Sequence, residues 1–428
     1  MRLRTTAVTA TLTAALLAPG AAASASVPAA VSSASTTTAR AAAAKPAAVK
    51  APAGMTTRLN AGARSTYLGS GFSGIVIDES TGRTLWSQRT GTTRMPASTQ
   101  KVMTAFTVLS STSPNTQLVT RVYQSPAVAG NVYLRGAGDP SLTSAKLKTL
   151  AARTAAQLKA QGRTSITLYA DASVFPAPTN ATGWKSSYIS GGEVQPIRGL
   201  TLAGYRGANG TTAAAKTFAT HLKSAGITAK VAGAGITPPQ ARELGASWSP
   251  TVSALVGRML SVSDNDYAEY MLRIAALESG KRPTWTNSLA HQREVLADAG
   301  IPLKGYVNKD GSGLSRSNRM PVNTLVSTVD HLWDDPSMRQ VAFAYGAMPR
   351  AGQTGTLRSR YKSAAQRCAT GKVMAKTGTL GDAVALAGVV RGSDGRTRAF
   401  AFIQNGNRKT SSVRNSIDTL ATATVGCR

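Results

Sequence analysis

Residues 96–109 read PASTQKVMTAFTVL, and the predicted fold and chemistry both rest on this stretch. Pro96 is typical of the first turn of a helix. The apolar residues that follow recur at the spacing of one helix face: Val102, Ala105, Phe106 and Leu109. Ser98 and Lys101 stand three positions apart near the start of this predicted helix, so their Cβ atoms lie about 5–6 Å apart on one face.

This Ser-x-x-Lys pattern pairs a nucleophile with an amine. A serine hydroxyl is a weak nucleophile until a base takes its proton, and none of the three histidines lies near the pair in sequence. A lysine acts as a base only when it is neutral, and burial or a neighbouring cation lowers its pKa. A helix start also brings backbone N–H groups to the attacked carbonyl. The pattern alone is not specific, because Ser359 and Lys362 repeat it.

Two further motifs make the pattern specific. Ser263-Asp264-Asn265 lies at the start of a second helical run, although Ser113 and Asn115 show the same spacing within a loop. Lys376-Thr377-Gly378 is the only Lys-Thr-Gly in the chain, and it lies on a predicted strand. The order of the three motifs, on helix, helix and strand, resembles that of the penicillin-recognising serine peptidases and β-lactamases.

The chain is most similar to the class C penicillin-binding proteins, which are D-alanyl-D-alanine carboxypeptidases and endopeptidases. The resemblance covers about residues 65–428, and four further stretches carry it: Arg135–Leu142, Asp171–Phe175, Asp310–Arg316 and Gly355–Arg358. It implies an α/β (α+β) transpeptidase fold, in which helices flank a five-stranded antiparallel sheet. It also implies acyl transfer on peptidoglycan stem peptides that end in D-Ala-D-Ala, with β-lactam antibiotics as covalent inhibitors.

The resemblance and the chemistry together imply the catalytic roles. Ser98 is the expected nucleophile of an acyl-enzyme, and Lys101 is the expected general base. Ser263 is expected to bridge Lys101 and Lys376 and to pass a proton to the leaving D-Ala. Asn265 is expected to bind the peptide amide of the substrate.

The Lys-Thr-Gly strand is expected on the substrate side of the site. Lys376, with the hydroxyl groups of Thr377 and Thr379 on either side of Gly378, is expected to hold the terminal carboxylate. The backbone N–H groups of Ser98 and Thr379 are expected to form the oxyanion hole. Which lysine is neutral at rest stays open at this point.

Two residues have alternative interpretations. Asp171 is expected either to bind the free amine of the third stem residue or to act as a turn residue at a strand end. Arg316 is expected either to line the same pocket or to form a surface ion pair. No cofactor or metal ion is expected, because the histidines lack metal-binding spacing and two cysteines cannot form a four-cysteine zinc site.

The 428 residues exceed what one core usually fills, so two domains are expected. The predicted catalytic domain comprises residues 65–118 and 250–428, with a smaller α/β domain, 119–249, inserted between them. Residues 1–25 have the basic start, apolar stretch and Ala-x-Ala site of a secretory signal peptide. Residues 26–64 are rich in Ala, Ser, Thr and Pro and are expected to form a disordered tether.

Export would place the protein outside the cytoplasm, in or near the cell wall. There a disulfide between Cys368 and Cys427 is favoured over two buried free thiols. No later run of about 18 apolar residues predicts a membrane span in the mature chain.

The chain carries 49 Lys and Arg against 19 Asp and Glu, a formal charge of +30. This charge is spread along the sequence without an aromatic-rich nucleic-acid motif, so nucleic acid is not an expected partner. Anionic wall polymers are the expected additional partners, with a general role of the charge in solubility as the alternative.

Three rival functions fit parts of the pattern. A β-lactamase would need a Glu-x-x-x-Asn motif between Ser-x-Asn and Lys-Thr-Gly, and no Glu in that interval has Asn four positions on. A catalytically inactive wall-binding protein is disfavoured, because every motif side chain is present. A Ser-His-Asp hydrolase would need a Gly-x-Ser-x-Gly elbow, which the sequence lacks.

Overall fold

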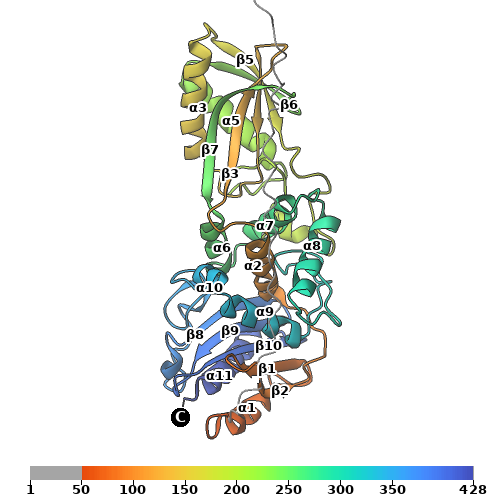
Figure 1. Cartoon of the computed structure of the whole chain (residues 1–428), viewed down its shortest axis with the longest axis vertical. Coiled ribbons are helices and arrows are strands. Elements are labelled where there is room, and N and C mark those ends of the chain that lie inside the picture. Colours follow the sequence, from red (N-terminus) through yellow and green to blue (C-terminus); the bar gives the residue numbers. More distant parts are fainter. Residues whose placement is uncertain (1–50, 428) are drawn as a thin grey trace, which may run out of the picture. The chain divides into compact units, whose positions relative to one another are not determined.

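The structure, a computed structural model, describes residues 51–427. These residues form two five-stranded sheets, each with its own covering helices, and a further group of helices (Figure 1). The predicted signal peptide, residues 1–25, lies outside the described residues, as does the predicted tether up to residue 50.

The first sheet is antiparallel throughout and combines strands from both ends of the described chain. Its strand order is β2-β1-β10-β9-β8. The strands are β1 (Phe72–Asp78), β2 (Thr84–Gln88), β8 (Val373–Leu380), β9 (Ala383–Arg391) and β10 (Thr397–Asn405). The predicted five-stranded antiparallel sheet is therefore confirmed, and the Lys-Thr-Gly motif lies on its edge strand, β8.

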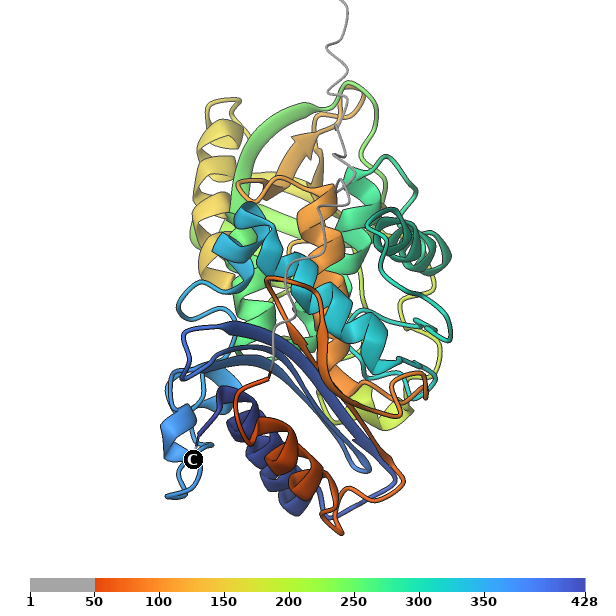
Figure 2. The same ribbon diagram turned by 60° about the horizontal axis from the view of Figure 1, so that its bottom comes forward.

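Both faces of this sheet are buried. Because successive side chains of a strand point to opposite faces, Phe400 and Phe402 of β10 pack with α1 (Met55–Ala63) and α11 (Thr410–Val425), which lie side by side on one face (Figure 2). Ile403 and its alternate neighbours belong to the core on the other face. Burial on both faces explains why β1, β9 and β10 are largely apolar.

The predicted tether ends earlier than residue 64, because its last residues form α1. Met55 and Leu59 are fully buried in the core that includes α11. They are four positions apart, so one helical turn places both on the same face. Burial of this apolar pair outweighs the Ala- and Pro-rich composition on which the prediction of disorder was based.

The second sheet is formed by residues 117–251 and has the strand order β6-β5-β4-β3-β7. Its strands are β3 (Gln117–Gln124), β4 (Asn131–Arg135), β5 (Ser165–Asp171), β6 (Thr228–Ala234) and β7 (Arg242–Thr251). The β4–β5 and β5–β6 pairs are parallel, and the others are antiparallel. Its core includes residues of α3 (Ser144–Lys159) and α5 (Gly210–Ser224). This mixed α/β structure agrees with the predicted content of residues 119–249, whose status as a separate domain stays a prediction.

The remaining helices position the motif residues. α2 (Gln100–Ser111) is buried along most of its length and contacts α7 (Asn265–Glu278), α8 (Trp285–Asp298) and α9 (Val322–Asp334). The other α-helices of the described chain are α4 (Ser186–Ser190), α6 (Val252–Ser261) and α10 (Pro336–Ala342). No helix within residues 51–427 combines the length and the apolar character that crossing a membrane requires.

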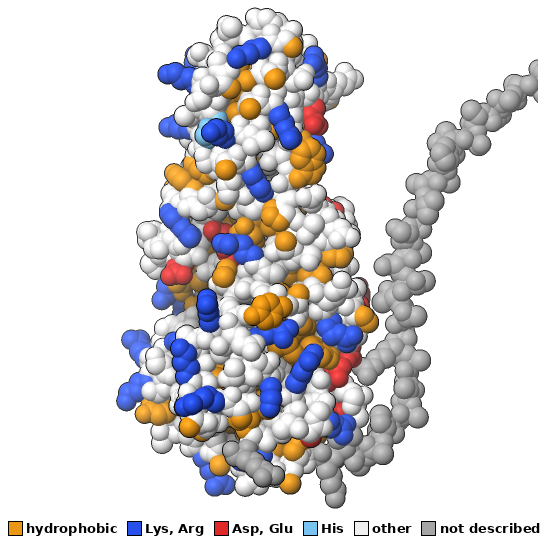
Figure 3. Space-filling model, turned by 90° about the vertical axis from the view of Figure 1, so that its left-hand side faces the viewer, with side chains coloured by type: hydrophobic (Ala, Val, Ile, Leu, Met, Phe, Trp, Pro, Cys, Tyr) orange, Lys and Arg blue, Asp and Glu red, His pale blue; other side chains and the backbone are white. Residues whose placement is uncertain are grey.

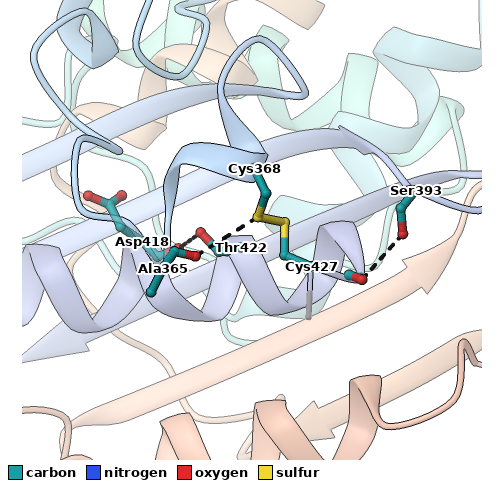
Figure 4. The surroundings of a disulfide bond; sticks show 7 residues. Ala365, Cys368, Ser393, Asp418, Thr422 and Cys427 are labelled. Atoms are coloured by element: carbon teal, nitrogen blue, oxygen red, sulfur yellow. Dashed lines mark hydrogen bonds between the residues drawn. A yellow bond between two sulfur atoms is a disulfide. The ribbon is translucent and has the colours of Figure 1, made fainter.

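The predicted disulfide between Cys368 and Cys427 is present (Figure 4). Cys368 lies in the 3-10 turn Arg367–Ala369, and Cys427 follows the end of α11. Beside the bridge, Ser393 donates hydrogen bonds to the last carbonyl groups of this segment, from its backbone N–H to Val425 at 2.8 Å and from its hydroxyl to Gly426 at 3.3 Å. The end of α11 is thus attached to two separate loops.

We expect the double variant Cys368→Ser/Cys427→Ser to unfold at a lower temperature than the wild type. The bridge joins residues 59 positions apart, and loss of a cross-link over such a loop costs about 4 kcal/mol in the loop-closure model. Thermal denaturation measures the shift. Mass spectrometry of the unreduced wild type should show two hydrogens fewer than the reduced chain. Alkylation of both cysteines without a reductant would contradict the bridge.

Candidate active site

Ser98 lies in a 3-10 turn, Ala97–Thr99, that leads directly into α2. Ala97 has φ of +47°, which is uncommon for a residue with a side chain. The turn lies against β8 at Gly378, where a Cβ atom would come within 2.7 Å of the Pro96 carbonyl oxygen and 3.1 Å of the Ser98 nitrogen. Glycine at this position therefore lets β8 pass directly beside the turn that carries Ser98.

The side chain of Lys101 is fully buried next to Ser98. Its Nζ is 3.3 Å from Ser98 Oγ, 2.7 Å from Asn265 Oδ1 and 2.8 Å from the carbonyl oxygen of Ser312. Asn265 Nδ2 in turn donates to the Glu193 carbonyl at 2.9 Å. Two acceptors besides the serine thus hold the amine within reach of the hydroxyl group.

Two buried carboxyl groups hold the loop that supplies the Ser312 carbonyl. Glu269 of α7 accepts hydrogen bonds from the backbone N–H groups of Gly311 at 2.7 Å and Ser312 at 2.8 Å. Asp310 accepts two backbone hydrogen bonds, from Gly313 and Ser315, and three side-chain hydrogen bonds, from Trp184, Ser312 and Asn318. The stretch Asp310–Arg316 therefore holds the amine of Lys101 in position through the carbonyl group of Ser312.

Lys376 of β8 is a second fully buried amine. Its Nζ donates to Ser263 Oγ at 2.8 Å and to the Thr377 carbonyl at 2.9 Å. Ser263 lies just before α7 with φ of +61°. The predicted bridge by Ser263 is present only to Lys376, because Asn265 is the α7 residue that contacts Lys101.

Burial lowers the pKa of both amines. The pKa of Lys101 falls to about 8, because desolvation of its charged form outweighs the attraction of Glu269 and Asp310. The pKa of Lys376 falls well below its usual value, through desolvation and repulsion by Lys101. Desolvation and the charge of Asp310 raise the pKa of Glu269 to about 8, against two backbone hydrogen bonds that lower it. A neutral amine is therefore available at moderate pH.

Ser98, Ser263 and Thr379 line two cavities. The larger cavity has a volume of about 900 Å³ and is also lined by Tyr188, Glu193, Asn265, Arg316 and Asp382. The smaller cavity has a volume of about 280 Å³ and is also lined by Thr356, Ser359, Arg360, Thr377 and Arg414. The serine hydroxyl therefore has space for two parts of a substrate, one in each cavity.

The structure does not bring Asp171 to this site. Asp171 ends β5 in the second sheet, and its Oδ1 accepts the Ser173 backbone N–H at 3.0 Å. Its Oδ2 accepts the backbone N–H and the hydroxyl of Thr237 at 2.8 and 2.6 Å. Both carboxylate oxygens are thus engaged within the second sheet and its loops. The amine-binding role expected for Asp171 is wrong, and the strand-end turn is what the structure contains.

Arg316 forms the ion pair of its second interpretation, and its substrate-side role stays a prediction. It lines the larger cavity together with Ser98. Its guanidinium group also forms a two-point ion pair with Asp382, at 2.9 and 2.8 Å. The ion pair fixes a planar cationic group at the wall of the cavity.

Several groups of the site were not predicted from the sequence. The motifs did not predict that the carbonyl groups of Ser312 and Glu193 accept hydrogen bonds from Lys101 and Asn265. They also did not predict that Glu269 accepts hydrogen bonds from backbone N–H groups. Arg414 is close to the C-terminus and has no motif around it. Within residues 51–427 no cluster of three or more His, Cys, Asp or Glu side chains is arranged to hold a metal ion.

Comparison with known proteins places this geometry in a family. The profile of the D-Ala-D-Ala carboxypeptidase 3 (S13) family matches residues 55–207 and 203–424. The chain is 32% identical to carboxypeptidase DacB of Mycolicibacterium smegmatis, over 87% of this chain and 84% of that protein. It is 26% identical to the D-alanyl-D-alanine carboxypeptidase of an Actinomadura species, over 78% of this chain and 77% of that protein.

A solved structure agrees in fold. Penicillin-binding protein 4 of Haemophilus influenzae superimposes with a TM-score of 0.73 at 22% identity, over 85% of this chain and 97% of that chain. The predicted fold class, a penicillin-binding-protein fold, is thereby confirmed. With the profile match over most of its length and a relative above 30% identity, the chain belongs to the D-Ala-D-Ala carboxypeptidase 3 (S13) family.

Proposed function

We propose that this protein is a serine-type D-alanyl-D-alanine carboxypeptidase/endopeptidase that acts on peptidoglycan stem peptides through an acyl-enzyme at Ser98. The observation that carries the proposal is the contact of Ser98 Oγ with the buried amine of Lys101, at 3.3 Å. This contact occurs in a member of a D-Ala-D-Ala carboxypeptidase family. A hydroxyl group next to an amine with a lowered pKa is an activated nucleophile.

In the acylation step, Ser98 Oγ attacks the carbonyl carbon of the penultimate D-Ala, and its proton passes to the neutral amine of Lys101. The backbone N–H groups of Ser98 and Thr379 stabilise the resulting oxyanion. The C–N bond to the last residue then breaks as the proton held by Lys101 is delivered to the leaving nitrogen, with Ser263, which is hydrogen-bonded to Lys376, as the proposed relay, so that Lys101 is neutral again. Water attacks the ester and releases the shortened stem peptide.

The free edge of β8 offers a place for the substrate backbone. Residues around Arg350 pair with the start of β8 at Met374. From Lys376 to Leu380 the described chain places no further strand beside β8, which is the last strand of its sheet. An extended peptide can add to such an edge by main-chain hydrogen bonds. Asn265 and Arg316 line the larger cavity, where they are proposed to bind the acyl side of the peptide.

We further propose that the protein works outside the cytoplasm, in the cell wall. The signal-peptide pattern of residues 1–25 and the disulfide of Cys368 support export. Basic side chains are scattered over the face shown in Figure 3, with few acidic ones among them. Such a surface favours loose, salt-sensitive association with anionic wall polymers.

Incubation with a fluorescent penicillin tests the nucleophile. We expect the wild type to carry one label per chain and the Ser98→Ala variant to carry none, because only the serine oxygen can form the ester. Release of D-Ala from a peptide that ends in D-Ala-D-Ala should be lost in the same variant.

The Ser113→Ala variant is the matched control, since it removes the exposed loop serine of the second Ser-x-Asn pattern and should still be labelled. Labelling of Ser98→Ala would identify another nucleophile. Rapid hydrolysis of the penicilloyl ester by the wild type would indicate a β-lactamase instead.

The pH dependence of acylation tests the base. Since the pKa of Lys101 is about 8, we expect the acylation rate to rise with pH and to level off above about 8, as the neutral amine accumulates. A guanidinium group stays protonated throughout this range. The Lys101→Arg variant should therefore lose about 10²- to 10⁴-fold in rate and show no inflection there. An unchanged inflection in that variant would assign the base to another group.

A further inference from the structure

The smaller cavity beside Ser98 contains a cation for which the motifs give no role. Arg414 of α11 lines this cavity together with the nucleophile and with Thr377 and Thr379. The Nε atom of Arg414 is buried and has no hydrogen-bond partner among the described residues. A buried guanidinium nitrogen without a partner costs free energy unless an acceptor arrives with the ligand.

A carboxylate on the same helix is already occupied. Asp418, one turn further along α11, accepts hydrogen bonds from Nε and from a terminal nitrogen of Arg360 through both of its oxygens. Desolvation raises the pKa of Asp418, and the charge of Arg414 acts to lower it. The hydrogen bonds that Asp418 accepts nevertheless come from Arg360. Of the two arginines in the cavity, Arg360 is therefore neutralised by its ion pair, whereas Arg414 forms no ion pair within residues 51–427.

The lysine expected to hold the substrate carboxylate is poorly suited to that task. Lys376 is fully buried, lines neither cavity, and donates to Ser263 and to the Thr377 carbonyl. Burial and repulsion by Lys101 lower its pKa well below the usual value, so a permanent charge on Lys376 is disfavoured. The positive charge that balances an anion in the smaller cavity must therefore come from a residue other than Lys376.

Hydroxyl groups complete a carboxylate-binding set in this cavity. Thr377 Oγ1 lies 2.8 Å from Thr356 Oγ1. Thr356 belongs to Gly355–Arg358, one of the stretches that carry the family resemblance. Thr379 and Ser359 also line the cavity. Hydroxyl donors around a planar guanidinium group suit a carboxylate, which accepts two parallel hydrogen bonds from arginine.

We propose that Arg414 is a specificity-determining residue that binds the carboxylate of the leaving D-amino acid in the smaller cavity, with Thr356 holding the Thr377 hydroxyl in place. The proposal rests on the function proposed above and names the part of the site that receives the leaving group. It predicts selectivity for substrates in which a carboxylate group is attached to the carbon next to the scissile nitrogen.

Two peptides that differ only at the C-terminus test this inference. One ends in D-Ala-D-Ala with a free carboxylate, and the other ends in D-Ala-D-alaninamide. For Arg414→Gln we expect kcat/KM on the acid to fall about 10- to 100-fold, while kcat/KM on the amide stays within about 2-fold of the wild type. Arg414→Lys should recover part of the loss on the acid.

Arg391→Gln is the control, because it removes the same charge from an exposed position at the far end of β9. It should behave as the wild type on both peptides. An equal fall on acid and amide in Arg414→Gln, or no change on either, would overturn the role of Arg414. Failure of the wild type to cleave either peptide would instead refute the proposed function, and the inference with it.

Thermal denaturation and complete labelling by excess fluorescent penicillin establish that Arg414→Gln is folded. Should this variant unfold, Arg414→Lys replaces it, since it keeps the charge but not the planar fork. A several-fold loss confined to the acid substrate would then support the proposal. An equal loss on acid and amide would contradict it.

Discussion

Two lysine amines buried at one site cannot both carry a charge at moderate cost, and the arrangement around Ser98 follows from this constraint. Each buried ammonium group would lose its hydration, and the two would repel each other. The protein surrounds the amines with hydroxyl and carbonyl acceptors instead of exposed water. Lys101 contacts Ser98, Asn265 and Ser312, and Lys376 contacts Ser263. One hydroxyl group is thereby left beside an amine that can accept its proton.

The fold satisfies this constraint by bringing distant segments into direct contact. The 3-10 turn that leads into α2 supplies Ser98 in the N-terminal part of the described chain, and β8 supplies Lys376 in its C-terminal part. Close approach depends on glycine at two points. A Cβ atom at Gly378 would lie 2.7 Å from the Pro96 carbonyl, and one at Gly313 would lie 1.9 Å from the Ala97 carbonyl. The turn that carries the nucleophile is therefore packed by backbone on two sides.

The smaller cavity depends on a second set of cross-links. Its walls come from the segment that contains Thr356 and from α11, which carries Arg414. The ion pair of Arg360 with Asp418 joins these two walls. The disulfide of Cys368 with Cys427, two residues beyond the end of α11, joins the chain after Arg360 to the end of this helix (Figure 4). At the proposed location outside the cytoplasm, such a cross-link is chemically stable.

The sequence by itself determined the family, the five-stranded sheet and the motif residues from Ser98 to Thr379, while the disulfide was favoured over two free thiols because export was expected. These follow from local features: side-chain spacing, strand alternation and motif order act over a few residues, so they can be read without coordinates. Asp171 shows the limit, since a strand-end aspartate looks the same in sequence whether it faces a substrate or its own loop. Only the tertiary structure showed that Glu269 holds the loop that contacts Lys101 and that Asp418 pairs with Arg360. It also showed that Arg414 lines a cavity together with Ser98. These pairings join residues up to hundreds of positions apart, and they depend on which side chains the packing desolvates together, which local sequence does not encode.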